Sequence, residues 1–313
     1  MQDYKAACFF LDVGQGTSQV IHLGNRRAII VDTGPKRQLS PLLFWLQDRK
    51  IQTIEALILS HNDADHIGEA ARIIESYGQQ IRYLYFLVDR KNNLFNRVVM
   101  NAVKDGYIER SKIRRLETDN EPKQLFKEAE IEIDLLFPAF ADNLESGTPN
   151  ETSAIIAFTI GTNRIIFSGD ASISAWEAIV DRHGRIEAQI FTAPHHGGSF
   201  TRSKPNTDAF QEEIVWFHRE AVLSGCMVVS VGTNNRYQHP EPKIISSHAK
   251  HGVEVLCTQG TPKCYGVGVA KDTACCGTIE VNIGPNSFCI KDIDLLRSQK
   301  SRIIRRLCLN QQQ

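Results

Sequence analysis

Two segments of the chain follow the same plan, and this internal repetition constrains the fold more than any other feature of the sequence. Residues 17–31 read as two strands joined by a turn, and they lead into a loop of small residues that holds Asp32. Residues 152–167 have the same pattern and lead into a similar loop that holds Asp170. Short apolar runs separated by turn residues are typical of hairpins. We therefore expect a pseudo-duplicated sandwich with a site between its halves, although two unrelated hairpins could also look this alike.

The rest of the chain alternates short apolar runs with helical stretches, which indicates an α/β fold. Ser40 before Pro41 is a typical helix start, because serine caps the first turn and proline fits its first position. The expected strands are 6–13, 18–23, Arg27–Val31 and Ala56–Leu59, and the expected helices are Pro41–Arg49 and 67–77. We expect one domain over residues 1–290, with a polar, mostly helical insertion at 92–128. A basic, amphipathic helical tail would follow over 291–313 and could rest on phosphate or on a protein.

Composition excludes several classes of protein. The 313 residues carry a formal net charge of +0, so no overall field attracts nucleic acid or an anionic membrane. The N-terminus lacks the basic start and apolar run of a signal peptide, and no apolar stretch approaches the roughly 20 residues that span a bilayer. We expect a cytoplasmic protein without a membrane partner.

The eight cysteines are expected to be reduced thiols rather than disulfides. Cys257, Cys264, Cys275 and Cys276 cluster near the end of the fold and could form part of a structural zinc site. Their spacing lacks the usual paired motif, so core or surface thiols are the favoured interpretation.

Four side chains of metal-ligand type occur within six residues, in the sequence His61-Asn-Asp63-Ala-Asp65-His66. This stretch follows an apolar strand and precedes a helix. Alternate positions let the first two ligands face one centre, and the turn into the helix directs the last two toward a second. Such a charge cluster is costly to bury without cations. A solvated turn with Asp65 as helix cap is the alternative, but a cap needs one such residue and not four.

This stretch resembles the H-x-H-x-D-H signature of metallo-β-lactamase-fold hydrolases, with aspartate at position 63 in place of histidine. Further motifs are similar to the hydrolase domain of ComEC-type competence DNA-uptake proteins and their stand-alone relatives. They occur in order over residues 6–284: Asp12-Val13-Gly14-Gln15-Gly16, Val31-Asp32-Thr33-Gly34, Asn150-Glu151-Thr152-Ser153, Phe167-Ser168-Gly169-Asp170, Pro194-His195-His196-Gly197-Gly198-Ser199 and His239-Pro240. The resemblance implies an αβ/βα four-layer sandwich, with two mixed sheets between outer helices.

The resemblance also implies roles for individual residues. His61 and Asp63 would hold a first metal, Asp65 and His66 a second, and Asp170 would bridge both. One imidazole of the His195-His196 pair would bind the second metal, and the sequence leaves open which. The remaining site residues would support the loops or contact substrate: Asp12, Asp32, Asn150, Ser199 and Asn234.

His239 lies in a polar loop that could place it over the metals as a general acid or as a hydrogen-bond donor to a phosphoryl oxygen. A surface histidine held by Pro240 is the plainer alternative. We expect Asp65 and His239 to be the catalytic residues. The other histidines, at 22, 183, 218, 248 and 251, are expected at the surface or in packing.

These observations predict a binuclear, metal-dependent hydrolase. Two metals suit phosphodiester cleavage, because charge develops on oxygen atoms in its transition state. The carboxylate-rich ligand set makes Mn²⁺ or Mg²⁺ credible beside Zn²⁺. The favoured function is a phosphodiesterase or nuclease acting on DNA or RNA. The alternatives are hydrolysis of a small phosphodiester, such as a cyclic nucleotide or phosphocholine ester, and a subunit that acts only with protein partners, for example in defence against foreign DNA.

Overall fold

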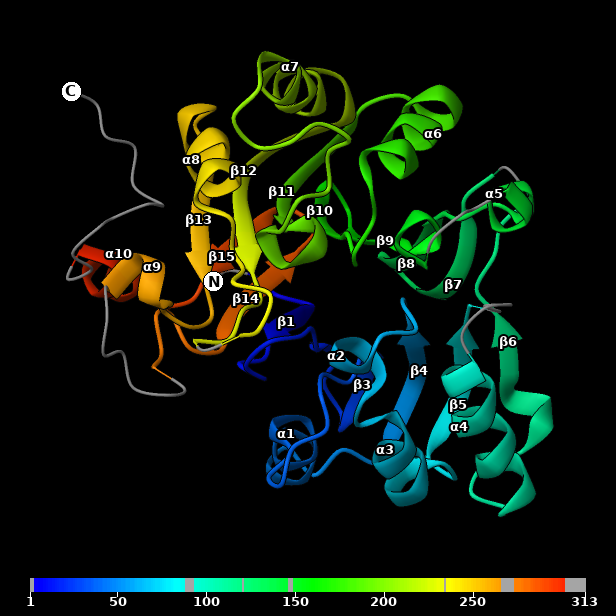
Figure 1. Ribbon diagram of the computed structural model, residues 1–313. Coiled ribbons are helices and arrows are strands. Elements are labelled where there is room, and N and C mark those ends of the chain that lie inside the picture. Colours follow the sequence, from blue (N-terminus) through cyan, green and yellow to red (C-terminus); the bar gives the residue numbers. More distant parts are fainter. Residues whose placement is uncertain are drawn as a thin grey trace.

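The computed structural model describes residues 3–87, 93–119, 121–145, 149–233, 235–265 and 273–301. Two mixed β-sheets face each other, and helices cover their outer faces (Figure 1). The first sheet has eight strands in the order β15-β14-β1-β2-β3-β4-β5-β6. These strands are β1 (Ala6–Phe10), β2 (Gln19–His22), β3 (Arg27–Val31), β4 (Thr53–Leu59), β5 (Ile81–Phe86), β6 (Ile113–Arg115), β14 (Ile279–Gly284) and β15 (Ser287–Ile290).

The second sheet has seven strands in the order β13-β12-β11-β10-β9-β8-β7. They are β7 (Lys123–Glu128), β8 (Ile131–Phe137), β9 (Ile155–Ile160), β10 (Asn163–Phe167), β11 (Ile186–Thr192), β12 (Val222–Val229) and β13 (Glu254–Cys257). The hairpins β2–β3 and β9–β10 are both antiparallel, and each is followed by a parallel pairing, β3 with β4 and β10 with β11. The two halves of the chain therefore share the topology that the internal repetition predicts.

Helices form the two outer layers. Around the first sheet lie α1 (Pro41–Asp48), α2 (Ala64–Ile67), α3 (Ala70–Tyr77) and α4 (Asn93–Lys104), and around the second lie α6 (Ile173–His183), α7 (Asp208–Trp216) and α8 (Pro242–Lys250) (Figure 1). The shorter elements are α5 (Phe140–Glu145), α9 (Pro262–Tyr265), α10 (Ile293–Ser301), the 3₁₀ turns η1 (Arg110–Lys112), η2 (Pro149–Thr152) and η3 (Pro194–Gly197), and the π-turn η4 (Phe217–Ala221).

Strand β3 shows how the layers are held together. Successive side chains of a strand point to opposite faces of its sheet. Accordingly, Ile29 and Val31 join the apolar cluster between the sheets, whereas Ala28 and Ile30 join the cluster beneath the helices of the first sheet. Both faces of the strand are thus buried, which explains its uninterrupted apolar run and confirms the four-layer sandwich.

Several boundaries differ from those expected. Helix α1 begins as predicted, because the Ser40 hydroxyl accepts a hydrogen bond from the Leu43 amide at 3.2 Å. The expected helix 67–77 is divided into α2 and α3, and the first strand ends at Phe10 instead of residue 13. The expectation that residues 92–128 are mostly helical is wrong, because β6 and β7 complete one edge of each sheet. In the expected tail, α10 is helical, and residues 302–313 lie outside the described residues.

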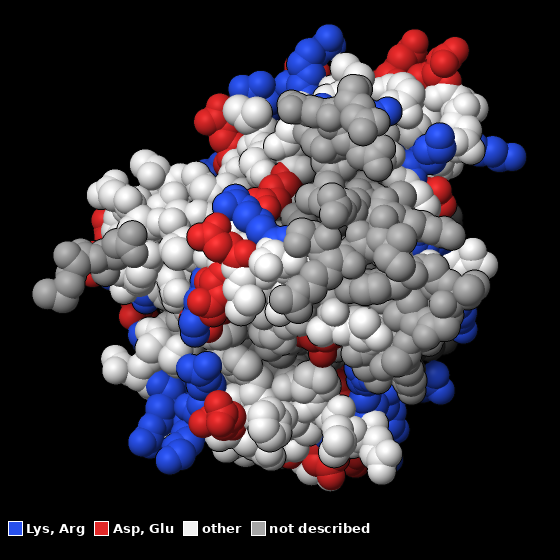
Figure 2. Space-filling view, turned by 90° about the vertical axis from the view of Figure 1, so that its left-hand side faces the viewer, with Lys and Arg blue, Asp and Glu red and all other residues white. Residues whose placement is uncertain are grey.

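Within the described parts of the chain, no helix is both long and apolar enough to cross a membrane. Figure 2 shows one face of the molecule, on which lysine and arginine side chains are interspersed with aspartate and glutamate. This mixture agrees with the formal net charge of +0.

Candidate metal centre

The expected ligands meet at the ends of parallel strands from both sheets. The strand β4 leads into His61 and α2, β10 leads into Asp170, and β11 leads into the His195-His196 pair. Ligand sites form readily at such edges, because the carboxyl ends of neighbouring parallel strands open on the same side. Two backbone hydrogen bonds join these loops, from Ala154 N to Ser60 O at 2.9 Å and from His195 N to Gly169 O at 3.1 Å.

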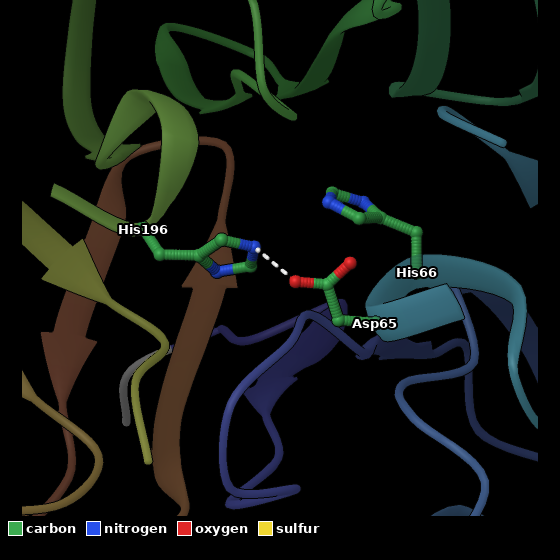
Figure 3. Close-up of side chains that lie close together, drawn as sticks. All are labelled: Asp65, His66 and His196. Atoms are coloured by element: carbon green, nitrogen blue, oxygen red, sulfur yellow. Dashed lines mark ion pairs between the residues drawn. The ribbon is translucent and has the colours of Figure 1, made fainter. Parts of the chain in front are cut away.

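Asp65, His66 and His196 form the centre of the cluster, and their side chains point toward one another (Figure 3). One potential ligand atom from each lies within 4.8 Å of the others. His196 Nε2 is 3.4 Å from Asp65 Oδ2 and 3.5 Å from Asp170 Oδ1, and His66 Nε2 is 3.0 Å from that same Asp170 oxygen. Residues from both halves of the chain therefore converge on one point.

The outer nitrogens of both histidines are held by acceptors. His196 Nδ1 donates to the Ser230 carbonyl at 2.9 Å, and His66 Nδ1 donates to Asp32 Oδ2 at 2.8 Å. In a neutral imidazole only one nitrogen carries a proton. When neutral, each ring would therefore direct the lone pair of Nε2 into the cluster, which is the tautomer that a metal ligand requires.

Electrostatics in the cluster favour positive charge. Burial alone would lower the pKa of His66, but Asp170 and Asp32 outweigh it and hold that pKa well above its ordinary value. Burial would raise the pKa of Asp170, but His66 and His196 outweigh it and hold it well below its ordinary value. Without a metal, protonated imidazole thus balances the buried carboxylates, and a divalent cation can take over this charge.

Among the buried side-chain nitrogens of the described residues that lack a hydrogen-bond partner are Nε2 of His61 and Nε2 of His196, two of the expected ligands. His61 is 1% exposed, and its Nε2 lies 3.5 Å from Asp63 Oδ2. A buried polar atom without a partner is costly, and a metal ion would remove that cost. The donor set of imidazoles and carboxylates therefore fits divalent metal ions.

The structure distinguishes the two adjacent histidines. His196 belongs to the three-residue group, whereas His195 is 30% exposed and its Nε2 is 3.9 Å from Asp170 Oδ2. Both have left-handed backbones, with φ of 51° and 54°. This conformation is uncommon in residues other than glycine. His61 and Asp63, the expected ligands of a first metal, lie together at the edge of the cluster.

Asp32 lies behind His66 and accepts four hydrogen bonds. Ser60 N donates to Oδ1 at 2.8 Å, and Oδ2 accepts from Thr17 Oγ1 at 2.8 Å, Ser60 Oγ at 2.6 Å and His66 Nδ1 at 2.8 Å. Such an arrangement fixes the imidazole and matches the supporting position expected for Asp32. In the second half, Ser153 Oγ accepts from Asp170 N at 2.8 Å.

Asp12 holds loops together. Its Oδ1 accepts from Gly14 N at 3.3 Å and from Gln259 Nε2 at 2.8 Å, and Gln259 Oε1 in turn accepts from Thr233 N at 2.8 Å. The glycines beside it permit a tight turn, since φ is +78° at Gly14.

His239 approaches the cluster from the second half of the chain. Its ring lies 5.1 Å from that of His195 and is stacked on Tyr237 at 5.7 Å. A Cβ at Gly198 would lie 2.3 Å from His239 Cε1, so glycine is needed there. Burial, reinforced by His195 and His196, lowers the pKa of His239 to about 4. The imidazole is therefore neutral near pH 7 and suited to donate a hydrogen bond.

The other expected residues are less informative. Ser199 is exposed, and its backbone carbonyl lies 3.3 Å from His195 Nδ1. Asn150 lies in η2, but its side chain is outside the described part of the structure, as is the whole of Asn234.

Sequence reasoning missed Thr17, Ser60 and Ser153, whose hydroxyls hold the aspartate loops. The internal repetition could have revealed Thr17 and Ser153, because a hydroxyl residue precedes the hairpin in both halves. Sequence reasoning also missed a groove above the cluster, with a volume of about 750 Å³. The groove is lined by Gln15, Pro35, Lys36, Asn62, Asp63, Ala64, Asp65, Asn235, Arg236 and Tyr237.

The cysteine cluster forms no zinc site in the described residues. Among those residues, potential ligand atoms of His, Cys, Asp or Glu come together in a group of three at Asp65, His66 and His196. Cys257, Cys275 and Cys276 are buried in the apolar core, as the favoured interpretation predicted, and Cys264 packs against it.

A second histidine cluster lies apart from this site. His248 is fully buried, its Nδ1 is 2.8 Å from His218 Nε2, and His218 is stacked on His251. The ring of His248 also packs against Phe200 and Phe217. These contacts confirm that His248 is a packing residue.

The known proteins that this chain resembles in sequence are much longer than it is. The chain is 23% identical to "ComE operon protein 3" of Bacillus subtilis (strain 168) over 79% of its length and 31% of that protein. It is 22% identical to "Competence protein ComA" of Neisseria gonorrhoeae over 81% of its length and 31% of that protein. The chain therefore spans about a third of the length of these relatives.

Among solved structures, a mutant of the CmlA beta-hydroxylase matches with a TM-score of 0.51 and 10% identity, covering 82% of this chain and 53% of that one. This likeness concerns the fold alone, since one fold can host different reactions. Residues 11–201, more than half of the chain, match the sequence profile of the metallo-beta-lactamase superfamily, whose fold binds divalent metals, typically two. Together with the His/Asp cluster between the two sheets, this match shows that the chain is a member of the metallo-beta-lactamase superfamily of hydrolases.

Proposed function

We propose that this hydrolase is a metal-dependent phosphodiesterase that cleaves nucleic acid. The observation that carries the proposal is the position of the cluster below a groove lined by Asp63 and Asp65 together with Lys36 and Arg236. Carboxylates alone would repel a phosphate, whereas metals at the base and cations in the walls would bind it. One of the relatives is named "Competence protein ComA", and a role in competence is consistent with a nucleic-acid substrate.

The contacts within the cluster support a set of metal ligands for this proposal. His61 and Asp63 would hold one ion, Asp65, His66 and His196 the other, and Asp170 would lie between them. Two divalent ions, when bound, would supply an activated water and neutralise developing charge on the phosphoryl oxygens. Carboxylate oxygens are hard ligands and imidazoles suit zinc, so Mn²⁺ and Zn²⁺ both fit this set.

The chain's own residues orient the reactants. Asp32 fixes the ring of His66, and the Ser230 carbonyl fixes that of His196. Lys36 and Arg236 would draw the phosphodiester into the groove. His239, held neutral by burial, would donate a hydrogen bond to an oxygen of the substrate.

The test is hydrolysis by protein that has been stripped with a chelator and reloaded with Mn²⁺, Mg²⁺ or Zn²⁺. The substrates are single- and double-stranded DNA, RNA, and bis-p-nitrophenyl phosphate. We expect cleavage of nucleic acid that is lost in the double variant Asp65→Ala/His66→Ala. The control is Asp48→Ala, because Asp48 is 63% exposed on α1.

Cleavage of bis-p-nitrophenyl phosphate alone would shift the function to a small phosphodiester or to a complex with protein partners. Failure to hydrolyse any of these substrates with any of the metals would refute the proposal.

A further inference from the structure

A second pocket adjoins the metal groove. It has a volume of about 420 Å³ and is lined by Thr233, Asn235, Arg236, Gln238, His239, Thr261, Pro262 and Lys263. Asn235 and Arg236 line both pockets. The two cavities are therefore neighbours, separated by the loop that carries these residues and His239.

The second pocket is basic. Lys263 lies in its wall with a side chain that is 28% exposed. Its Nζ is 3.5 Å from the Pro240 carbonyl and 3.7 Å from a carboxylate oxygen of Glu241. Both distances exceed those of good hydrogen bonds, so the ammonium retains donors for a ligand.

Arg236 contributes a second positive charge, because it lines both cavities. Its guanidinium lies 4.6 Å from the centre of the Tyr237 ring and also contacts the Tyr237 hydroxyl. Arg236 is exposed, so its side chain can turn toward a phosphate on either side. The loop therefore places positive charge on both sides of the position where a bound strand would cross it.

Two such pockets suit a chain of regularly spaced phosphates. We propose that the Lys263 pocket binds the phosphate next to the scissile one, so that the preferred substrate is a polynucleotide strand with consecutive phosphodiesters. A small diester with one phosphate would fill the metal groove and leave this pocket empty. The inference rests on the proposed function and selects between the two substrate classes that it leaves open.

The first test measures binding and needs no catalysis. A fluorescently labelled ten-nucleotide oligothymidylate is titrated with protein in EDTA over a series of KCl concentrations. Loss of one phosphate contact lowers the slope of log K against log salt by about 0.7 for a single strand. We expect this decrease in Lys263→Gln, whereas Lys263→Arg and the exposed control Lys250→Gln keep the parent slope.

The second test measures selectivity with metal-loaded protein. The kcat/KM for the ten-mer is divided by that for thymidine 5′-p-nitrophenyl phosphate, which has a single phosphate. We expect this ratio to fall about ten-fold in Lys263→Gln, as the loss of one charge-assisted contact predicts. Thermal melting of each variant establishes that it is folded.

An equal salt slope in Lys263→Gln and Lys250→Gln would overturn the inference, and so would an equal loss of kcat/KM on both substrates. Failure of the proposed function looks different, because the parent protein would then hydrolyse neither substrate with any metal. The salt slope in EDTA would still decide whether Lys263 contacts a phosphate.

Discussion

Replacing Asp32 by asparagine should weaken metal binding although Asp32 is not itself an expected ligand. The substitution keeps the shape of the side chain and replaces Oδ2, which accepts three hydrogen bonds, with an amide nitrogen that can only donate. The hydroxyls of Thr17 and Ser60 can rotate and accept a hydrogen bond from this amide. The His66 ring can accept at Nδ1 only by moving its proton to Nε2, the atom that faces Asp170.

The expected magnitude follows from this change of tautomer. A protonated Nε2 cannot bind a metal, so binding requires the original tautomer and leaves two donors facing each other at Nδ1. Disruption of such an outer contact costs about 10–100-fold in metal affinity. This range corresponds to about 1.4–2.7 kcal/mol.

The assay is competition between stripped protein and a chromogenic chelator for Zn²⁺ or Mn²⁺. Asp48→Asn serves as the control, because it makes the same chemical change on the exposed face of α1. The companion variant Thr17→Val removes one hydroxyl from Asp32 but leaves the imidazole contact in place. It should lower the free energy of unfolding by about 1 kcal/mol. Its metal affinity should decrease less than that of Asp32→Asn.

A folded Asp32→Asn protein that binds metal as tightly as the parent would refute this reasoning. So would an equal loss of affinity in Thr17→Val, because that result would attribute the effect to the hydroxyl and not to the tautomer.

Three further predictions concern stability. Stripping the metals should lower Tm, and reloading should restore it, since a ligand at 1,000 times its Kd stabilises the folded protein by about 4 kcal/mol. A Tm in scanning fluorimetry that EDTA does not change would contradict a metal centre. Burial, with the charge of His251, lowers the pKa of His218 to about 4, so between pH 4 and its ordinary 6.5 the unfolded chain binds more protons. The contribution of neutral His218 to the free energy of unfolding is complete above pH 6.5 and decreases below it, by about 2 kcal/mol at pH 5. His218→Gln should therefore flatten the pH dependence of the urea midpoint, and an unchanged pH dependence would exclude the effect. Glu55 is buried between two arginines, with Oε1 3.2 Å from Nη1 of Arg27 and Oε2 3.1 Å from Nη1 of Arg82. Glu55→Gln should therefore lower the free energy of unfolding by about 1.5–3 kcal/mol, and a midpoint equal to the parent's in urea would count against it.

The sequence predicted those parts of the site that are local in the chain. His61, Asp63, Asp65 and His66 lie within six residues, so one strand end and one short helix bring them together. The choice between His195 and His196 could not be predicted in this way. It depends on two left-handed residues and on the Ser230 carbonyl, which follows a different strand.

Strands that are buried on both faces could be predicted from the sequence. Strands that are exposed on one face could not. The run in β3 is apolar throughout because both of its faces are covered. The edge strand β7 alternates only weakly and has one buried residue, Leu125, so its polar residues resemble a surface helix. The groove residues Lys36 and Arg236 are separated by 200 positions, and only the tertiary structure brings them together.

The position of β14 has a consequence for how the chain is made. Ala6 in β1 pairs with Ile283 in β14, 277 residues later (283 − 6). At a synthesis rate of about 5–20 residues per second, β1 waits roughly 14–55 s for this partner. During that time one edge of the first sheet has unpaired backbone groups, which can pair with other chains. The nascent protein is therefore expected to depend on chaperones, and co-expression of a chaperone should increase the yield of soluble protein.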